Sequence, residues 1–256
     1  SIADQGIDTS KTLVIKVDGQ MRTRVRPGEA ATVKVPLLFP DRAPLPKLSW
    51  EVSHNKNDIS GMCTVLNGTL HIPPMGVGTV KIEAFTPKAQ ERITGRYTIG
   101  HNQVRAISTS KDTISVLYRG ETKSQRHQVK FTVTEFTMPY DAVKDADLQV
   151  QWCIYSKKSD VKKHFIVTDD GNKHSISNGA NGEFSYTGTS EKEGKWYVEA
   201  FANNPTGSTD TSKLLTAIQP KITKAYWADS KGNRINRSGF KHTVYMHIET
   251  EGLSGE

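Results

Sequence analysis

The chain lacks most features that would assign it to a specialised class of protein. Its 256 residues include only two cysteines, Cys63 and Cys153, which are too few and too far apart for a disulfide framework. No apolar run approaches the roughly 20 residues of a membrane-spanning helix. These absences exclude a disulfide scaffold and predict no membrane insertion.

Catalytic and metal-binding motifs are also missing. The sequence has no G-x-S-x-G, no phosphate-binding loop, no H-E-x-x-H and no pair of C-x-x-C motifs. Its eight histidines never have the i, i+2 or i, i+4 spacing that would place two on one face of a strand or helix. Residues 169–172 (Asp-Asp-Gly-Asn) lack the acidic spacing of a calcium loop and predict a hairpin turn. We therefore expect no enzyme activity, no catalytic, cofactor-binding or metal-binding residues and no cofactor.

The net charge of +7 is not concentrated in one basic segment. Three arginines, Arg22, Arg24 and Arg26, alternate with less polar residues, which predicts one strand with all three on its solvent face. Four lysines flank a predicted loop (Lys157, Lys158, Lys162 and Lys163). We interpret both groups as solvated surface and expect no nucleic-acid partner.

Alternating patterns rich in β-branched and aromatic residues dominate the chain, and no amphipathic helix is evident. Strands are predicted at 13–17, 32–35, 80–82, 129–133 and 243–248. Turn signals separate them at 18–19, 27–28, 67–68, 170–172, 181–182 and 231–233. Many short strands between turns are typical of β-sandwiches.

Three blocks of sequence occur twice in the same order. The first has a central tryptophan between apolar residues, the second begins with Asn-Gly and the third ends in Glu-Ala-Phe. The pairs are 48–52 with 150–154, 67–70 with 181–184, and 78–85 with 194–201. Each repeat then has about 110 residues, the size of one immunoglobulin-like sandwich.

The repeat predicts equivalent environments for matched residues. Trp50 and Trp152 are expected at equivalent buried positions, as in strand C of an immunoglobulin-like domain. In the third block, Glu83 and Glu199 are expected on the solvent face. Because each repeat holds one cysteine, both thiols are expected to stay reduced. The inward positions of the third block are Val80, Ile82 and Ala84, with Trp196, Val198 and Ala200.

The last residues look like the beginning of a further repeat. Residues 222–227 resemble 104–107, and residues 243–248 resemble 129–133. We predict an all-β chain with one immunoglobulin-like sandwich at 1–103, a second at 104–219, and the start of a third, truncated module at 220–256. These strands alone bury too little apolar surface, so they must pack on the second sandwich, pair with another copy or stay mobile. Val244, Met246 and Ile248 would share one face, which favours packing over mobility.

Adjacent aromatic residues raise the question of a carbohydrate platform. In a strand, one member of Tyr226–Trp227 must point away from the core, and Tyr197 beside Trp196 has the same constraint. Packing against a neighbouring domain is the interpretation we favour.

Three segments carry a resemblance to a known family: 225–233, 244–256 and 194–201. They resemble the immunoglobulin-like repeats of large Bacteroidota proteins associated with type VI secretion, which are often encoded with PAAR-like spike components and carry toxin domains. The resemblance implies a non-catalytic structural or interaction module of a larger secreted or injected effector or spike-associated protein. It names no active-site residue, and this chain contains no visible PAAR-like or toxin segment.

The expected partners are proteins: a secretion spike, a toxin domain, or an immunity or chaperone protein. The expected location is extracellular, reached without a cleaved signal peptide. The alternative is a cell-surface glycan-binding or adhesin-like protein built from tandem sandwiches.

Overall fold

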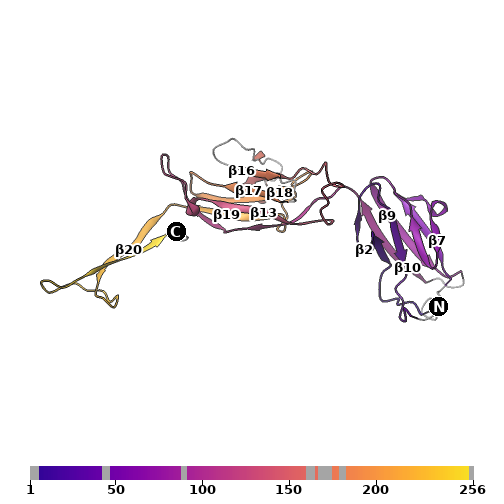
Figure 1. Cartoon of the computed structure of the whole chain (residues 1–256), viewed down its shortest axis with the longest axis horizontal. Coiled ribbons are helices and arrows are strands. Elements are labelled where there is room, and N and C mark those ends of the chain that lie inside the picture. The colour runs from indigo at the N-terminus through magenta and orange to yellow at the C-terminus, as the bar shows by residue number, and fades with distance from the viewer. Residues whose placement is uncertain are drawn as a thin grey trace. The chain divides into compact units, whose positions relative to one another are not determined.

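The computed structural model describes residues 6–41, 47–87, 91–159, 165–166, 175–178 and 183–253. The chain divides into two compact units, with the boundary between Asn102 and Gln103. Figure 1 shows strands throughout both units. Within the described residues, no helix has the length and apolar character needed to cross a membrane.

The first unit is a sandwich of two five-stranded sheets. One sheet has the order β2-β1-β4-β8-β7 and consists of Gln20–Met21, Val14–Val17, Ala31–Lys34, Thr69–Ile72 and Thr64–Leu66. The other has the order β3-β10-β9-β5-β6 and consists of Arg24–Val25, Arg92–Ile99, Gly78–Phe85, Ser49–His54 and Asn57–Asp58. A single 3₁₀ turn, η2 (Ser60–Met62), follows β6.

The second unit repeats this arrangement. Its first sheet has the order β11-β13-β17-β16 and consists of Val104–Thr109, Val129–Phe136, Phe184–Gly188 and Ser175–Asn178. Its second sheet has the order β12-β19-β18-β14-β15 and consists of Thr113–Ser115, Ser212–Ile218, Gly194–Phe201, Gln151–Tyr155 and Phe165–Ile166. A 3₁₀ turn, η3 (Gln125–His127), precedes β13.

The two sandwiches share one topology, which is immunoglobulin-like. One sheet contains β1-β4-β8-β7 in the first unit and β11-β13-β17-β16 in the second. In the other sheet, a short strand runs parallel to the last long strand: β3 beside β10 in the first unit, and β12 beside β19 in the second. This is the A-B-E-D sheet facing a sheet that contains G, F and C. The expectation of an all-β chain with tandem immunoglobulin-like sandwiches is confirmed.

The paired tryptophans occupy equivalent strands. Trp50 on β5 pairs with Ala84, and Trp152 on β14 pairs with Ala200, so both lie at the same place in the second sheet. Trp152 is completely buried, whereas Trp50 is only partly buried at the edge of its core. The two sites therefore match in topology and differ in depth.

Two of the predicted turns have the backbone that a tight hairpin requires. Asn67 and Gly68 join β7 to β8 with φ angles of 49° and 74°. Asp18 and Gly19 join β1 to β2 with φ angles of 48° and 76°. Consecutive positive φ values define the type I′ turn, which favours Asn-Gly and Asp-Gly because their steric cost there is low. The predicted turn at 181–182 lies outside the described residues.

The predicted solvent-exposed arginine strand is wrong. The segment breaks after β2, which belongs to the first sheet, and resumes as β3 in the second sheet, so the alternation of a single strand does not hold. Arg26 is buried and Arg22 is partly buried, and both contact Glu29, with nitrogen–oxygen distances of 3.4 and 3.3 Å. Arg24 is half-buried and donates to the carbonyl of His101 at 3.0 Å. The arginines therefore support the first sandwich instead of facing solvent.

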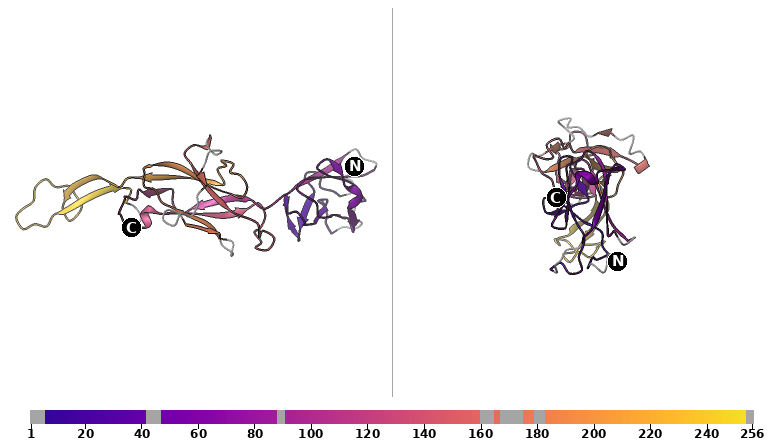
Figure 2. Two further views of the ribbon diagram at one scale, coloured as in Figure 1. Left: turned by 90° about the horizontal axis from the view of Figure 1, so that it is seen from above. Right: turned by 90° about the vertical axis from the view of Figure 1, so that its right-hand side faces the viewer.

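The last element is a hairpin of β20 (Lys221–Ala228) and β21 (Tyr245–Glu251). Figure 2 shows the two strands side by side, and among the described strands they form a two-stranded sheet of their own. The predicted packing of this segment on the second sandwich is wrong for Met246 and Ile248, which are exposed. Tyr226 stacks on His247 and is half-buried, whereas Trp227 is 52% exposed. Among the described residues, Trp227 is therefore not covered by a neighbouring domain, and the expected packing stays a prediction.

Candidate functional site

Three features of the chain combine groups that could support a function: a buried carboxylate on β18, a polar network around η3, and the exposed hairpin. The buried carboxylate belongs to Glu199, which was predicted to face solvent. Glu199 is instead 1% exposed, and the prediction is wrong at this position. The matched residue Glu83 lies on β9 with its side chain 41% exposed and pairs with Arg92.

A longer connection explains why the two glutamates differ. The connection after β9 runs from Thr86 to Glu91, whereas the connection after β18 runs from Ala202 to Thr211. The longer segment folds back over its sheet. The backbone N–H of Thr206 donates to Glu199 at 2.7 Å, and that of Gly207 donates at 3.0 Å. The strand pattern placed Glu199 on the outer face correctly, but the loop covers that face.

Side-chain hydroxyls complete the surroundings of Glu199. Tyr155 donates its hydroxyl at 2.9 Å, and Thr211 donates at 3.2 Å. The neighbouring Cys153 is buried, and both this burial and the charge of Glu199 raise the pKa of its thiol to about 12. Such a thiol is unreactive at neutral pH because the thiolate is the nucleophile. This cluster therefore anchors a loop and has no exposed reactive group.

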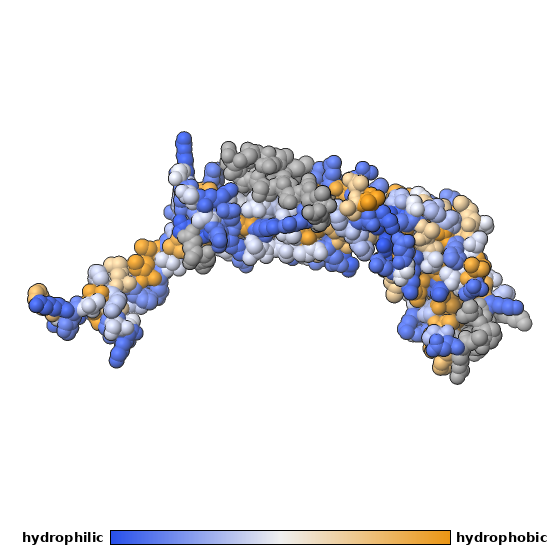
Figure 3. Space-filling view, in the orientation of Figure 1, coloured by the Kyte–Doolittle hydropathy of each residue, from blue (hydrophilic) through white to orange (hydrophobic). Residues whose placement is uncertain are grey.

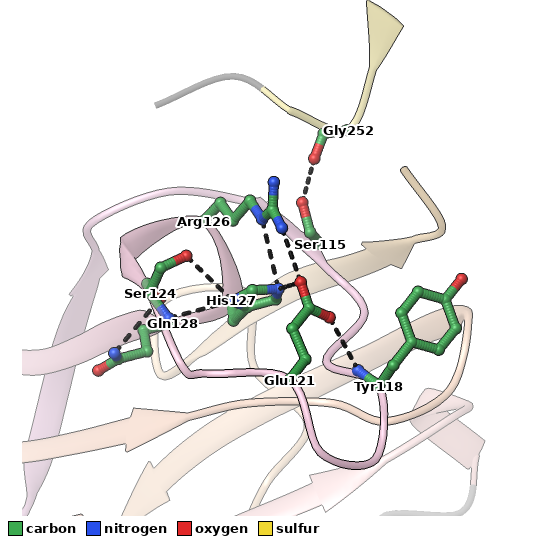
Figure 4. A network of polar contacts seen from close by, with 8 residues as sticks. All are labelled: Ser115, Tyr118, Glu121, Ser124, Arg126, His127, Gln128 and Gly252. Atoms are coloured by element: carbon green, nitrogen blue, oxygen red, sulfur yellow. Dashed lines mark hydrogen bonds and ion pairs between the residues drawn. The ribbon is translucent and has the colours of Figure 1, made fainter. Parts of the chain in front are cut away.

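The polar network around η3 contains serine, histidine and glutamate in contact (Figure 4). The Ser124 hydroxyl lies 3.1 Å from Nδ1 of His127, and Nε2 of His127 lies 3.2 Å from Oε1 of Glu121. Arg126 also donates to Glu121 at 2.6 Å, and the Tyr118 backbone N–H donates to its other oxygen at 3.2 Å. The Tyr118 N–H bond, followed by that of Arg126, lowers the pKa of Glu121 from 4.5.

This geometry does not suit nucleophilic catalysis. Nδ1 of His127 already accepts the backbone N–H of Ser124 at 3.1 Å, so its lone pair is occupied and cannot take the proton of the Ser124 hydroxyl. His127 is also fully buried. Ser124 and His127 instead form the reciprocal contacts of a capping box around η3. The network fixes the loop between β12 and β13.

The same loop region borders the base of the hairpin. Ser115, at the end of β12, donates its hydroxyl to the carbonyl of Gly252, just after β21 (Figure 4). Gly252 has a φ of 81° and lies against Ile218 and Pro220. A side chain at residue 252 would strain the backbone and approach these two residues closely. Glycine is therefore required at this contact.

The described members of the remaining basic and acidic candidates do not assemble into a site. Lys157 is exposed, and the ammonium of Lys158 lies 5.2 Å from the ring centre of Tyr197. Lys162, Lys163 and the predicted turn at 169–172 lie outside the described residues. Among the residues that the structure describes, no group of three histidine, cysteine or acidic side chains could hold a metal ion.

No family model and no curated protein matches the chain. The FdeC adhesin of Escherichia coli is 16% identical over 80% of this chain and 64% of that chain, with a TM-score of 0.29. The D00–D0 domains of intimin are 12% identical over 81% and 100%, with a TM-score of 0.32. The first eight immunoglobulin domains of the cell adhesion molecule DSCAM are 11% identical over 80% of this chain and 24% of that chain, with a TM-score of 0.27. These TM-scores are too low to carry an argument, so the fold assignment rests on strand order.

Proposed function

We propose that this chain is a non-catalytic structural and interaction part of a larger protein, in which tandem sandwiches space and present other domains. The observation that carries the proposal is the repetition of one sandwich topology in two consecutive units. The polar clusters at Glu199 and His127 support it, because their groups are directed at the chain's own loops. Such modules serve by length, rigidity and surface.

The finer part of the proposal concerns delivery. The resemblance of residues 190–256 to type VI secretion-associated repeats favours a secreted or injected effector or spike-associated protein. Its partners would then be the secretion spike, a toxin domain, or an immunity or chaperone protein. This part of the proposal is supported by the resemblance alone.

Export from the encoding bacterium tests the proposal. A tagged form of the natural full-length protein would be followed in the medium of cells with the type VI secretion genes intact or deleted. We expect export only when those genes are present. Equal export by both strains would refute the delivery reading. Specific binding to a glycan array that is lost in a Trp227→Ala variant would favour the adhesin-like alternative.

A further inference from the structure

The β20–β21 hairpin has two faces of opposite character. One face holds two ion pairs, Lys221 with Glu251 at 2.8 Å and Lys224 with Glu249 at 2.9 Å. The other face is mainly apolar and carries Ile222, Ala225, Trp227, Met246 and Ile248, with Thr250 opposite Ile222. Such segregation is typical of a sheet with one face in water and the other in a core.

The apolar face is nevertheless exposed. Ile222, Trp227, Met246 and Ile248 are 62%, 52%, 54% and 46% exposed, and Figure 3 shows hydrophobic residues at the surface of the hairpin. An isolated two-stranded hairpin is only marginally stable in water. A concentrated apolar face of this kind indicates an interaction surface. What covers it can be argued from the pairing of its strands.

The strand pairing of the hairpin resembles that of the first two strands of the second sandwich. In that sandwich, β11 pairs with β13 with two register shifts, one that skips Arg105 on β11 and one that skips Thr134 on β13. In the hairpin, β20 pairs with β21 with a register shift that skips Thr223. Alignment of Ile222 with Val104 places the shifts at Thr223 and at Arg105 at the same residue, whereas the second shift of the β11–β13 pair has no counterpart in the hairpin. A β-bulge is a specific feature of a strand pair, because it changes which residues face each side.

The equivalence extends along both strands. Ile107 pairs with Val133 in the second sandwich, and Ala225 pairs with Ile248 in the hairpin. Two residues further on, the pairs are Thr109 with Phe131 and Trp227 with Met246. Phe131 and Val133 are buried in the core of the second sandwich. Met246 and Ile248 are therefore the core residues of an equivalent sheet.

The segment after β20 also lacks the neighbour that its counterparts have. The first sandwich uses β3 and the second uses β12 as short strands parallel to the last strand of the second sheet. After β20, the corresponding segment makes only an isolated bridge, between Arg234 and Ala228. Phe240 in this segment is 91% exposed.

We propose that the hairpin is half of a third immunoglobulin-like sandwich, whose apolar face is covered by a second sheet of the same module. That sheet is supplied by polypeptide that follows residue 256 in a longer form of the protein. Its last strand would run parallel to the segment around Ile235, and a large apolar side chain from its central strand would contact Trp227 and Met246. The inference does not depend on how the protein is exported, so the two proposals fail separately.

Thiol labelling at two adjacent positions tests this inference. Met246→Cys and Tyr245→Cys would be made separately in a Cys63→Ser background, which removes the partly exposed native thiol. The other native cysteine, Cys153, can stay because it is buried. Met246 lies on the apolar face and is 54% exposed, whereas Tyr245 lies on the opposite face and is 51% exposed. In the 256-residue chain, we expect labelling rates within a factor of about two of each other, since both positions are accessible.

The comparison is then repeated in a chain extended by about 100 residues of the encoding gene, the length of one sandwich. There, labelling at position 246 should slow by about tenfold or more, while the rate at position 245 stays unchanged. Hydrogen exchange of the unsubstituted β20 and β21 in both chains provides the second measurement and should show protection only in the extended chain.

Several results would overturn the inference. Equal labelling at the two positions in the extended chain, together with unchanged hydrogen exchange, would show that the apolar face stays uncovered. A reading frame that stops at residue 256 would remove the proposed second sheet. Protection of position 246 in a dimer of the 256-residue chain would make a second copy the occupant instead.

Discussion

Replacement of Glu199 by alanine tests whether a buried carboxylate holds the connection between β18 and β19. Glu199 accepts hydrogen bonds from the Thr206 and Gly207 backbones at 2.7 and 3.0 Å and from the Tyr155 hydroxyl at 2.9 Å. Each bond to a charged acceptor contributes about 1.5–3 kcal/mol. These contributions do not add, because the substitution also removes the desolvation cost of the carboxylate and water can enter. We expect a net loss of about 3 kcal/mol in the second unit.

Glu83→Ala is the matched control, because Glu83 has the same place on the equivalent strand of the first unit. Its contact with Arg92 is solvent-exposed, and exposed ion pairs contribute at most about 1 kcal/mol. Glu199→Gln keeps the shape and one oxygen acceptor, so its cost should lie between the two alanine variants.

Unfolding should be followed by hydrogen exchange, peptide by peptide, across a urea series. The chain contains two units, and a single midpoint would mix their transitions. Glu199→Ala should lower the stability of peptides from residues 103–218 and leave the first unit unchanged. It should also release the amides of Thr206 and Gly207 first. Equal costs for Glu199→Ala and Glu83→Ala, or unaltered exchange in residues 202–211, would refute the reasoning.

Three further predictions follow from burial and charge. Trp152→Ala should lower the free energy of unfolding of its unit by about 3–5 kcal/mol, the range for a large aromatic residue removed from a core. Trp50→Ala should cost clearly less because that side chain is only partly buried. Equal shifts in the urea midpoints of the two units would contradict this expectation. Thiol counting should find two free groups in denaturant, whereas the native protein should leave Cys153 unlabelled at pH 8, because burial raises the pKa of its thiol to about 12; a disulfide found by non-reducing mass spectrometry would disprove it. The ionised Glu121 should stabilise the second unit fully above about pH 4.5, and this stabilisation should be lost as the pH falls through the lowered folded-state pKa. Glu121→Gln should flatten the dependence of stability on pH in this acid range. An unchanged pH profile of stability in the variant would contradict the network.

The sequence determined the class of fold because its signals are local or repeated. Period-two alternation predicted strands, and Asn67–Gly68 predicted a tight hairpin because its backbone needs positive φ at two consecutive residues. The repeated blocks around Trp50 and Trp152 predicted equivalent strands, and their pairing with Ala84 and Ala200 places both on the same strand of each sandwich. The sequence also indicated the two strands of the β20–β21 hairpin, because residues 222–227 resemble 104–107 and residues 243–248 resemble 129–133.

Only the tertiary structure decided which polar residues are covered. Glu83 and Glu199 share the Glu-Ala-Phe sequence and the outer face of matched strands, yet the Glu83 side chain is partly exposed and Glu199 is buried under a longer connection. Arg26 is buried and Arg22 is partly buried because their segment changes sheets between β2 and β3 and contacts Glu29. Strand alternation specifies the side of a sheet on which a residue lies, whereas burial depends on which distant loop or sheet covers that side.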